Sequence, residues 1–155
     1  MAAADERFTA RAAALGIEVD AQRFPQGTRT ASEAAAAVGC EVAQIVKSLV
    51  FMADDEPVLA LTSGANRVDE SKLAHAVGAE RVRKATADEV RAATGYAIGG
   101  TPPFGHDREL TILCDRDLAA LEVVWAAAGT PTDVFAIPAD RLVAIAGARV
   151  VDLAA

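Results

Sequence analysis

Apolar and polar residues follow two alternating periods along the chain, and these periods predict interspersed helices and strands. Apolar positions that recur every three to four residues are typical of helices, whereas alternating or short continuous apolar runs are typical of strands. The predicted helices cover residues 5–15, 33–38, 70–77, the segment from Thr86 to Gly95, and 139–146. The predicted strands cover residues 17–24, 46–53, 58–63, 109–115, 122–128, 133–138 and 148–153, with 80–85 as a short strand or an extended link.

Local signals mark the ends of these helices. Thr30 and Glu33 have the spacing of a capping box, in which each side chain binds the backbone N–H of the other. Thr86 and Glu89 have the same spacing, and Asp69 can cap the helix after it. A glycine follows four of the helices, as is usual at a helix C-terminus: Gly16, Gly39, Gly78 and Gly95.

The order of these elements indicates the fold class. Short turns separate the strands within residues 46–63 and within 122–138, so both ranges predict hairpins with antiparallel pairing. A chain of 155 residues suits one compact domain, residues 1–155, and no internal repeat or linker divides it. We therefore expect an α/β (α+β) fold with a mixed, mostly antiparallel sheet.

Composition and charge narrow the class of protein. Hydrophobic residues make up 52% of the chain, and no apolar run approaches the ~20 residues that span a bilayer. The N-terminal stretch has no apolar core of a signal peptide. The net charge of −7 argues against tight non-specific nucleic-acid binding, and no helix-turn-helix or basic stripe suggests DNA. Cys40 and Cys114 have no metal-like spacing, which favours a reducing, cytoplasmic location.

Lys47 interrupts an almost unbroken apolar strand, "QIVKSLVFM". It shares a strand face with Leu49 and Phe51, and both faces are mainly apolar, so we expect the strand to be covered on both sides. A buried ammonium without a partner is costly. Lys47 either snorkels to water from the strand entrance or points into a cleft to stabilise an anion, and the pattern alone leaves both open.

The segment "GYAIGGTPPFGH" is the part of the chain richest in glycine and proline. Gly99 and Gly100 allow a close backbone approach, and Pro102 and Pro103 stiffen the second half of the segment. Such a loop can present backbone N–H groups to a carbonyl or phosphate oxygen, or it can be an ordinary turn. It matches no nucleotide-binding fingerprint. His106, at the end of the loop, is a candidate general base or a surface residue.

Four further sets of residues are candidates for the site. Ser48 adjoins Lys47 but lacks a nucleophile elbow, and the two cysteines lack an activating context. Asn66 lies in a loop that can border the cleft or simply precede a helix. Asp133 can hold a substrate amino group or serve in a turn. The basic cluster can touch phosphates or form a solvated face: Arg81, Arg83, Lys84 and Arg91.

The strand-borne lysine and the glycine–proline loop, in this order, resemble the YbaK/prolyl-tRNA-synthetase-associated editing-domain family. The matching pieces are "AAAVGCEVAQIVKSLVF", "LALTSGANRVDESKLAHAVGAERVRKATADEVRAATGYAIGGTPPFG" and "VFAIPADRLVAIAGARVVDL". The resemblance implies a partly barrel-like sheet flanked by helices, and a deacylase that acts in trans. Such an enzyme hydrolyses the ester of a mischarged tRNA, with tRNA for proline carrying a small wrong amino acid as the expected substrate.

The resemblance also implies site residues. Lys47 matches the family's lysine and residues 99–103 match its GxxxP loop, so Lys47 and Gly100 are the expected catalytic residues. The expected substrate-binding residues are Gly99, Thr101, Pro102, Pro103, Phe104, Ser48, Phe24, Asp133, Asn66 and His106. No metal and no cofactor are expected. Many relatives have Ser or Thr in place of Pro102, and some have Tyr near Phe24, so the preferred amino acid stays open.

The resemblance implies partners as well. They are the acceptor end of a mischarged tRNA and, as a further candidate, an aminoacyl-tRNA synthetase, with neither DNA nor a membrane. The chain is expected to be a monomer or a homodimer. The alternative function is a non-catalytic module that binds a nucleotide or a synthetase in the same cleft. Release of an amino acid from mischarged tRNA separates the two functions.

Overall fold

The computed structural model describes residues 3–25, 28 and 30–155, and its strands form two sheets. The smaller sheet is antiparallel, in the order β1–β7–β6. Its strands are β1 (Gln22–Arg23), β6 (Val123–Ala127) and β7 (Asp133–Pro138). The larger sheet has the order β4–β2–β3–β5–β8. Its strands are β2 (Val46–Ala53), β3 (Glu56–Ser63), β4 (Val82–Lys84), β5 (Thr111–Asp115) and β8 (Arg149–Val151).

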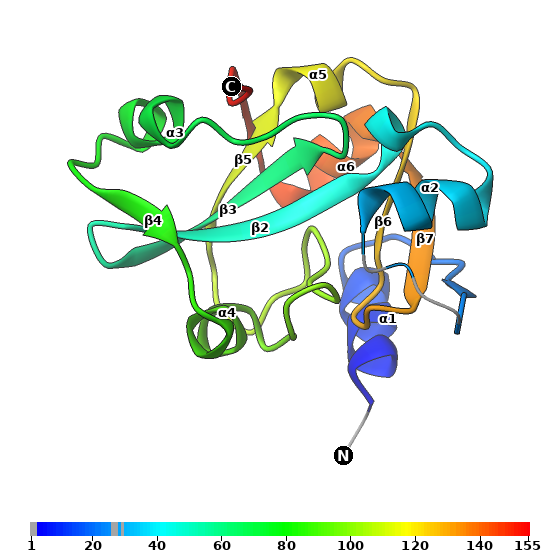
Figure 1. Ribbon diagram of the computed structural model, residues 1–155. Helices are drawn as coiled ribbons and strands as arrows, with labels where there is room; N and C mark the ends of the chain where they lie inside the picture. Colours follow the sequence, from blue (N-terminus) through cyan, green and yellow to red (C-terminus); the bar gives the residue numbers. More distant parts are fainter. Residues whose placement is uncertain (1–2, 26–27, 29) are drawn as a thin grey trace.

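The strand pairing confirms a mixed, mostly antiparallel arrangement, divided between two sheets rather than held in one. Both predicted hairpins are present, as β2–β3 and β6–β7. Strand β4 pairs antiparallel with β2, whereas the β3–β5 and β5–β8 pairs are parallel. An isolated parallel bridge between Ile45 and Trp125 joins the two sheets where β2 begins. Figure 1 shows β6 and β7 beside the N-terminal end of β2.

The helices begin and end close to the local signals in the sequence. They are α1 (Ala4–Ala14), α2 (Ala31–Val38), the 3₁₀ helix η1 (Val42–Gln44), α3 (Glu70–Val77), α4 (Ala87–Thr94), α5 (Arg116–Ala119) and α6 (Ala139–Ala146). Thr30, Asp69 and Thr86 each accept hydrogen bonds from the first turn of the following helix, as predicted. The Thr86–Glu89 pair forms a full capping box.

The sequence-based assignment was wrong in two places. Only Gln22–Arg23 of the predicted strand 17–24 pairs with another strand. Ile17 instead donates its backbone N–H to Ala12 and packs into the core, so the alternating pattern reflects burial without a ladder. The short helix α5 was not predicted, because its single turn after β5 is capped by Asp115 and carries too few residues for a periodic pattern.

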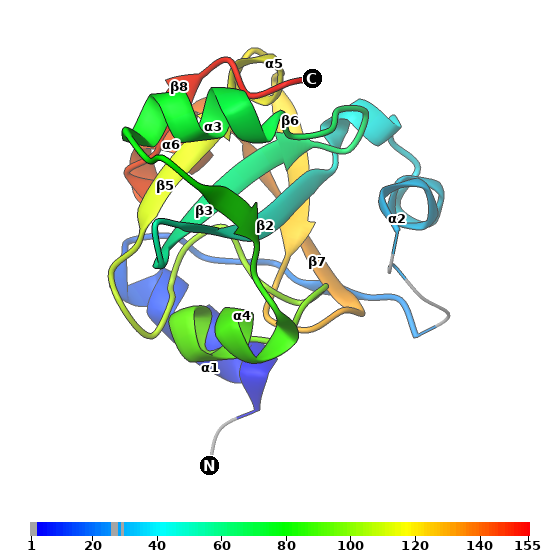
Figure 2. The ribbon, with the colours of Figure 1, turned by 60° about the vertical axis from the view of Figure 1, so that its left-hand side comes forward.

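The larger sheet is covered on both faces, as the two apolar rows of β2 predict. On one face, Phe51, Ala60 and Leu113 pack with Leu73 of α3. On the other face, Val46, Val50 and Leu59 belong to the main core. Figure 2 shows α3 lying over the first of these faces. Among the described residues, no helix is both long enough and apolar enough to cross a membrane.

Candidate active site

The N-terminal half of β2 has a free edge. Strand β4 pairs with β2 only at residues 51–53, and the last backbone hydrogen bond runs from the Ala85 N–H to the Val50 C=O at 3.0 Å. The next residue, Thr86, is the N-cap of α4, so the chain leaves the sheet there. The capping box in the sequence therefore determines where the edge of β2 opens.

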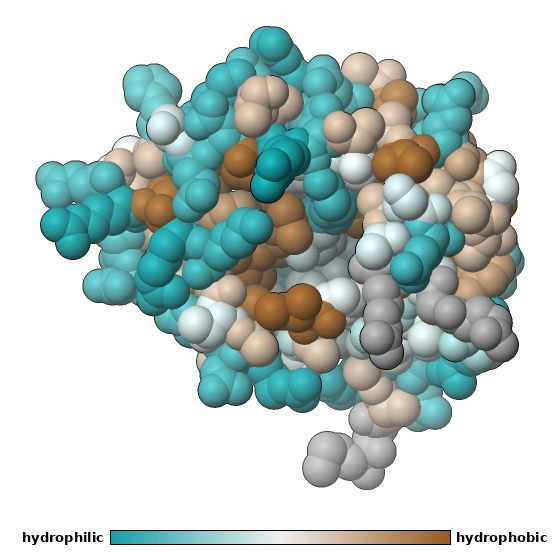
Figure 3. Space-filling view, viewed as in Figure 1, coloured by the Kyte–Doolittle hydropathy of each residue, from teal (hydrophilic) through white to brown (hydrophobic). Residues whose placement is uncertain are grey.

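A cavity of about 420 Å³ lies along this free edge. Residues 46–51 of β2 form one wall, and the apolar face of α2 forms another through Ala31, Ala34 and Val38. Trp125 of β6 and Pro131 of the β6–β7 turn close the side that faces the smaller sheet. Figure 3 shows the hollow beside β2, with apolar surface gathered around it. Its volume lies within the range of small-molecule sites, ~300–1,000 Å³.

Lys47 lies in this wall, half-buried, and its ammonium Nζ donates a hydrogen bond to the backbone carbonyl of Asn66. Burial lowers the pKa of Lys47, the positive charge of Arg67 lowers it further, and the buried Asp115 opposes both. Lys84 adds a third positive charge near the cavity. Within the described part of the chain, no ion pair involves any of these three cations. The edge of the cavity is therefore positive, although the whole chain is acidic.

Asn66, whose backbone carbonyl accepts from Lys47, is held in place by Asp115, a buried carboxylate that was not among the predicted site residues. The Asn66 side-chain amide donates to Asp115 at 2.8 Å and to Asp117 at 2.9 Å. Asp115 is fully buried and also accepts from the backbone N–H of Ser63 at 3.2 Å. These contacts fix the loop whose carbonyl receives Lys47. Asn66 itself does not line the cavity, and it positions the lysine instead.

The glycine–proline loop forms a tight turn against the cavity. The Gly100 N–H donates to the Ala97 carbonyl at 3.0 Å, and the Thr101 hydroxyl donates to the same carbonyl at 3.0 Å. Gly99 has φ of 86°, a left-handed conformation that favours glycine. Gly99 and Thr101 line the cavity, and in the described hydrogen bonds their N–H groups have no acceptor. The Gly100 N–H is therefore already used within the turn, whereas those of Gly99 and Thr101 are not used by the described residues.

Gly100 is close-packed against the β6–β7 turn. A Cβ at this position would lie 2.8 Å from the Thr130 Cα and 3.0 Å from the Pro131 nitrogen. Gly100 is buried and does not line the cavity. The close backbone approach at Gly100 is thus made by the protein's own β6–β7 turn.

Helix α1 holds both ends of this loop. The Arg11 guanidinium donates to the Gly105 carbonyl at 3.0 Å, and the Tyr96 hydroxyl donates to the same carbonyl at 3.1 Å. The Arg7 guanidinium donates to the Gly95 carbonyl at 2.9 Å and lies over the Tyr96 ring. None of these contacts was predicted, because α1 and the loop are about 90 residues apart in the sequence.

The residues after Thr101 support the loop rather than line the cavity. Pro102 and Pro103 are buried, and the His106 ring nitrogen Nε2 lies 2.7 Å from the Pro102 carbonyl. Burial lowers the pKa of His106. Phe104 packs in the core, with its ring centre 5.3 Å from that of Phe8. His106 and Phe104 are therefore placed to brace the loop.

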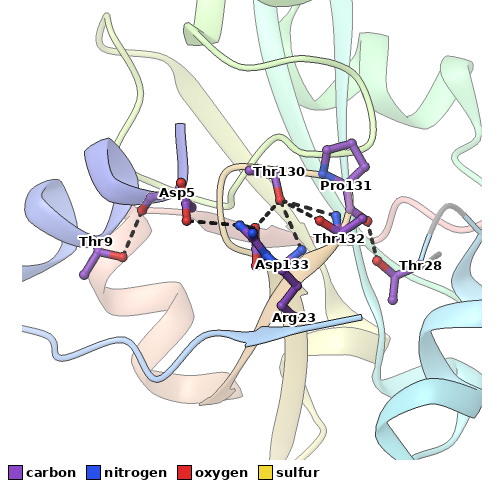
Figure 4. Close-up of polar contacts among 8 residues, drawn as sticks. All are labelled: Asp5, Thr9, Arg23, Thr28, Thr130, Pro131, Thr132 and Asp133. Atoms are coloured by element: carbon purple, nitrogen blue, oxygen red, sulfur yellow. Dashed lines mark hydrogen bonds and ion pairs between the residues drawn. The ribbon is translucent and has the colours of Figure 1, made fainter. Parts of the chain in front are cut away.

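Asp133 is engaged by a neighbouring arginine. Arg23 binds it with two hydrogen bonds, of 2.9 and 3.1 Å, and the Thr130 hydroxyl donates a third (Figure 4). The side-chain hydrogen bond with Arg23 lowers the pKa of Asp133. Nearby, the Thr28 hydroxyl donates a hydrogen bond to the Pro131 carbonyl. Asp133 thus ties β7 to β1, and its carboxylate is not open to a substrate amine.

The structure brings four of the expected site residues to the cavity: Lys47, Ser48, Gly99 and Thr101. Phe24 is half-buried and donates its backbone N–H to Thr132 at 2.8 Å, outside the cavity. The walls from α2 and the β6–β7 hairpin were missed, and the alanine-rich pattern of α2 was the only sequence signal for them. Among the described residues, no Asp, Glu, His or Cys lines the cavity, and no cluster of three such residues could hold a metal.

An apolar cavity of this size, with a lysine in its wall and further positive charge at its rim, is typical of a small-molecule site. The chain matches the aminoacyl-tRNA editing domain family over residues 25–145, and it belongs to this family. It is similar to a crystal structure of a candidate trans-editing enzyme for prolyl-tRNA synthetase, with 44% identity and a TM-score of 0.93. That match covers 100% of this chain and 99% of the other.

The curated relatives are proline–tRNA ligases. The enzyme of Limosilactobacillus fermentum is 35% identical over 113 residues, which cover 69% of this chain and 20% of the ligase. The enzyme of Lactobacillus gasseri is 41% identical over 78 residues, which cover 50% of this chain and 14% of the ligase. The chain therefore spans a fifth or less of the length of these relatives, and corresponds to one part of them.

Proposed function

We propose that this protein hydrolyses the ester of a mischarged tRNA in trans, with tRNA for proline carrying a small wrong amino acid as substrate. The observation that carries the proposal is the cavity between the free edge of β2 and the glycine–proline loop. Lys47 and two unpaired backbone amides of the described residues meet there. Membership of the editing-domain family and the likeness to a candidate trans-editing enzyme support the same function.

The chemistry requires a positioned water and stabilisation of the oxyanion that forms when the water attacks the ester carbonyl. In this proposal the N–H groups of Gly99 and Thr101, two residues that line the cavity, donate to that oxygen, and Lys47 supplies a positive charge in a partly desolvated site. The described cavity wall offers no carboxylate or imidazole as a base. We assign proton transfer to the neighbouring ribose hydroxyl of the tRNA or to solvent, because an aminoacyl ester is already activated.

The positive rim is the proposed contact for phosphates of the tRNA acceptor end. Lys47, Arg67 and Lys84 have no carboxylate partner among the described residues. Arg83, a sequence-based candidate for phosphate contact, is paired with Glu89 at 2.7 Å. With a net charge of −7, recognition is confined to the acceptor end and is weak elsewhere. A synthetase as additional partner, the cytoplasm as location and a monomeric or dimeric state remain parts of this proposal.

The apolar cavity selects the amino acid by size. Its walls are formed largely by aliphatic side chains of α2 and β2, with Trp125 at one side. Steric exclusion rejects larger amino acids, while each methylene that does fit changes binding by only ~1–3 kcal/mol. Small aliphatic amino acids therefore fit this wall better than charged ones.

The test is deacylation of tRNA for proline charged with Ala, Cys, Ser, Thr or Pro, each measured against spontaneous hydrolysis in buffer. We expect release of at least one small wrong amino acid and little release of proline. Binding of the charged tRNAs without any release above the buffer rate would instead support the non-catalytic binding module.

A further inference from the structure

Ser48 carries three polar groups for which the described residues provide no partner. Its hydroxyl is buried and makes no hydrogen bond. Its backbone N–H and C=O lie at the free edge of β2, beyond the last hydrogen bond to the β4 segment. Buried polar groups without a partner are uncommon in folded proteins. Ser48 also lines the cavity, so a ligand can reach it.

The direction of the Ser48 backbone groups follows from the strand register. In an antiparallel strand, the N–H and C=O of alternate residues point to the same side. The Ile45 C=O accepts from Gly64, on the β3 side, and the Val50 C=O accepts from Ala85, on the β4 side. Ser48 is two residues before Val50, so its N–H and C=O point to the β4 side as well.

One strand residue is missing opposite Ser48. Continuing the register of Phe51 with Lys84 would place Ala87 opposite Ser48. Ala87 is instead the first residue of α4, because the Thr86 capping box starts the helix there. The gap in the ladder is therefore built into the sequence, and the cavity occupies it.

We propose that the backbone of Ser48 binds the aminoacyl group as the missing strand residue would. An α-aminoacyl ester carries an N–H donor and a C=O acceptor on one residue, as does each member of a hydrogen-bonded antiparallel pair. The Ser48 C=O accepts from the α-amino group, and the Ser48 N–H donates to the ester carbonyl. This assignment rests on the proposed function and names the group that the site recognises.

The arrangement is compatible with the rest of the site. The ester carbonyl oxygen has two lone pairs, so it accepts from Ser48 and from the Gly99–Thr101 turn together. An amine donates N–H in both of its protonation states, so the contact needs no carboxylate. Asp133, the carboxylate first considered for this role, is held by Arg23.

The substrate-side test compares alanyl-tRNA with isobutyryl-tRNA, in which a methyl group replaces the α-amino group. Each rate is divided by the spontaneous rate of the same ester, because the α-amino group itself activates the ester. We expect the rate enhancement for the isobutyryl ester to be lower than that for the alanyl ester by a factor of about 10 or more, since the Ser48 C=O loses its donor. Lactyl-tRNA keeps an O–H donor and is expected to fall between. Equal enhancement for the alanyl and isobutyryl esters would overturn the assignment.

The protein-side test removes one backbone N–H. Replacing Ser48 with its α-hydroxy acid analogue turns the amide into an ester and keeps the side chain. We expect kcat/KM for alanyl-tRNA to fall about 10-fold with a folded protein. The matched control is the same backbone change at Met52, which lies in the β2–β4 ladder opposite Arg83. The Met52 backbone change should lower Tm but leave the ratio of the alanyl-tRNA to the isobutyryl-tRNA rate enhancement unchanged. An unchanged kcat/KM in the folded residue-48 variant contradicts the proposal.

A second readout separates failure of this assignment from failure of the proposed function. If the protein hydrolyses none of the charged tRNAs, the proposed function fails. Binding of the aminoacyl group to the Ser48 backbone is then tested by measuring the affinity for stable substrate analogues. The probes are then 3′-alanylamino-3′-deoxyadenosine and its 3′-isobutyrylamino counterpart, which are stable amides that differ only in the α-amino group. Tighter binding of the alanylamino compound supports docking at Ser48, provided that the residue-48 backbone change removes the difference. Equal binding, or none, overturns it.

Discussion

Replacing Lys47 with alanine is the change that most directly tests the proposed chemistry. The ammonium is half-buried at the cavity wall and makes one hydrogen bond, to the Asn66 carbonyl. A unit charge about 5 Å from a developing oxyanion, at an effective dielectric constant of about 20, stabilises it by about 3 kcal/mol. At ~1.4 kcal/mol per factor of ten, kcat should fall by about 10²-fold.

The stability of the same variant should change little. The lost hydrogen bond contributes about 0.5–1.5 kcal/mol. Against this, the variant no longer buries an ammonium beside Arg67 and Lys84, which together with burial lower the lysine's pKa. Because the folded-state pKa lies below the unfolded value of 10.5, this cost is present at neutral pH and is relieved as pH rises toward 10.5. The parent should therefore gain stability relative to Lys47→Ala as the pH is raised.

The assay is single-turnover deacylation of mischarged tRNA together with thermal unfolding, for the parent and the variant. Lys72→Ala is the matched control, because Lys72 lies on α3, is paired with Asp152 and does not line the cavity. The control should keep parental kcat. A Lys47→Ala protein with near-parental kcat, on a substrate that the parent hydrolyses, would refute the catalytic role of this lysine.

Substitutions at three further positions and one binding measurement test the site and its supports. Gly100→Val should lower Tm and deacylation together, because its Cβ would meet the Thr130 backbone at 2.8 Å; an unchanged Tm would contradict this packing. Arg11→Met should lower kcat more than it raises KM by loosening the loop, with Arg11→Lys retaining more activity, and equal effects of the two would argue against a positioning role. Asp133→Asn should cost stability at pH 7, and this cost should shrink progressively as pH falls below 3.8 toward the lowered pKa of Asp133, because the stability that the lowered pKa contributes is lost there; Tm measured across a falling pH series checks this. Binding of the tRNA acceptor end should show a log–log salt slope of about −1.4, as expected for two phosphate contacts, from Arg67 and Lys84, at ~0.7 each, and a slope steeper than about −5 would require a larger basic surface.

The local elements and one side of the site could be predicted without knowledge of tertiary contacts. Helix starts at Thr30, Asp69 and Thr86 could be predicted because a cap depends on residues two or three positions apart. The β2–β3 hairpin could be predicted because its strands are separated by a short turn. Lys47 and the glycine–proline loop were also evident, since a charge in an apolar strand and a Gly/Pro cluster are visible without any contact.

The way in which these pieces form a cavity depends on long-range packing and could not be predicted. The wall from α2 meets β2 through packing of side chains, and the β6–β7 hairpin meets the start of β2 across about 80 residues of sequence, as in the bridge between Ile45 and Trp125. Asp133 was considered for substrate, yet it is bound by Arg23, 110 residues away. Local patterns encode hydrogen bonds between near neighbours, whereas the partner of a buried charge and the shape of a cavity depend on which distant side chains the packed core brings together.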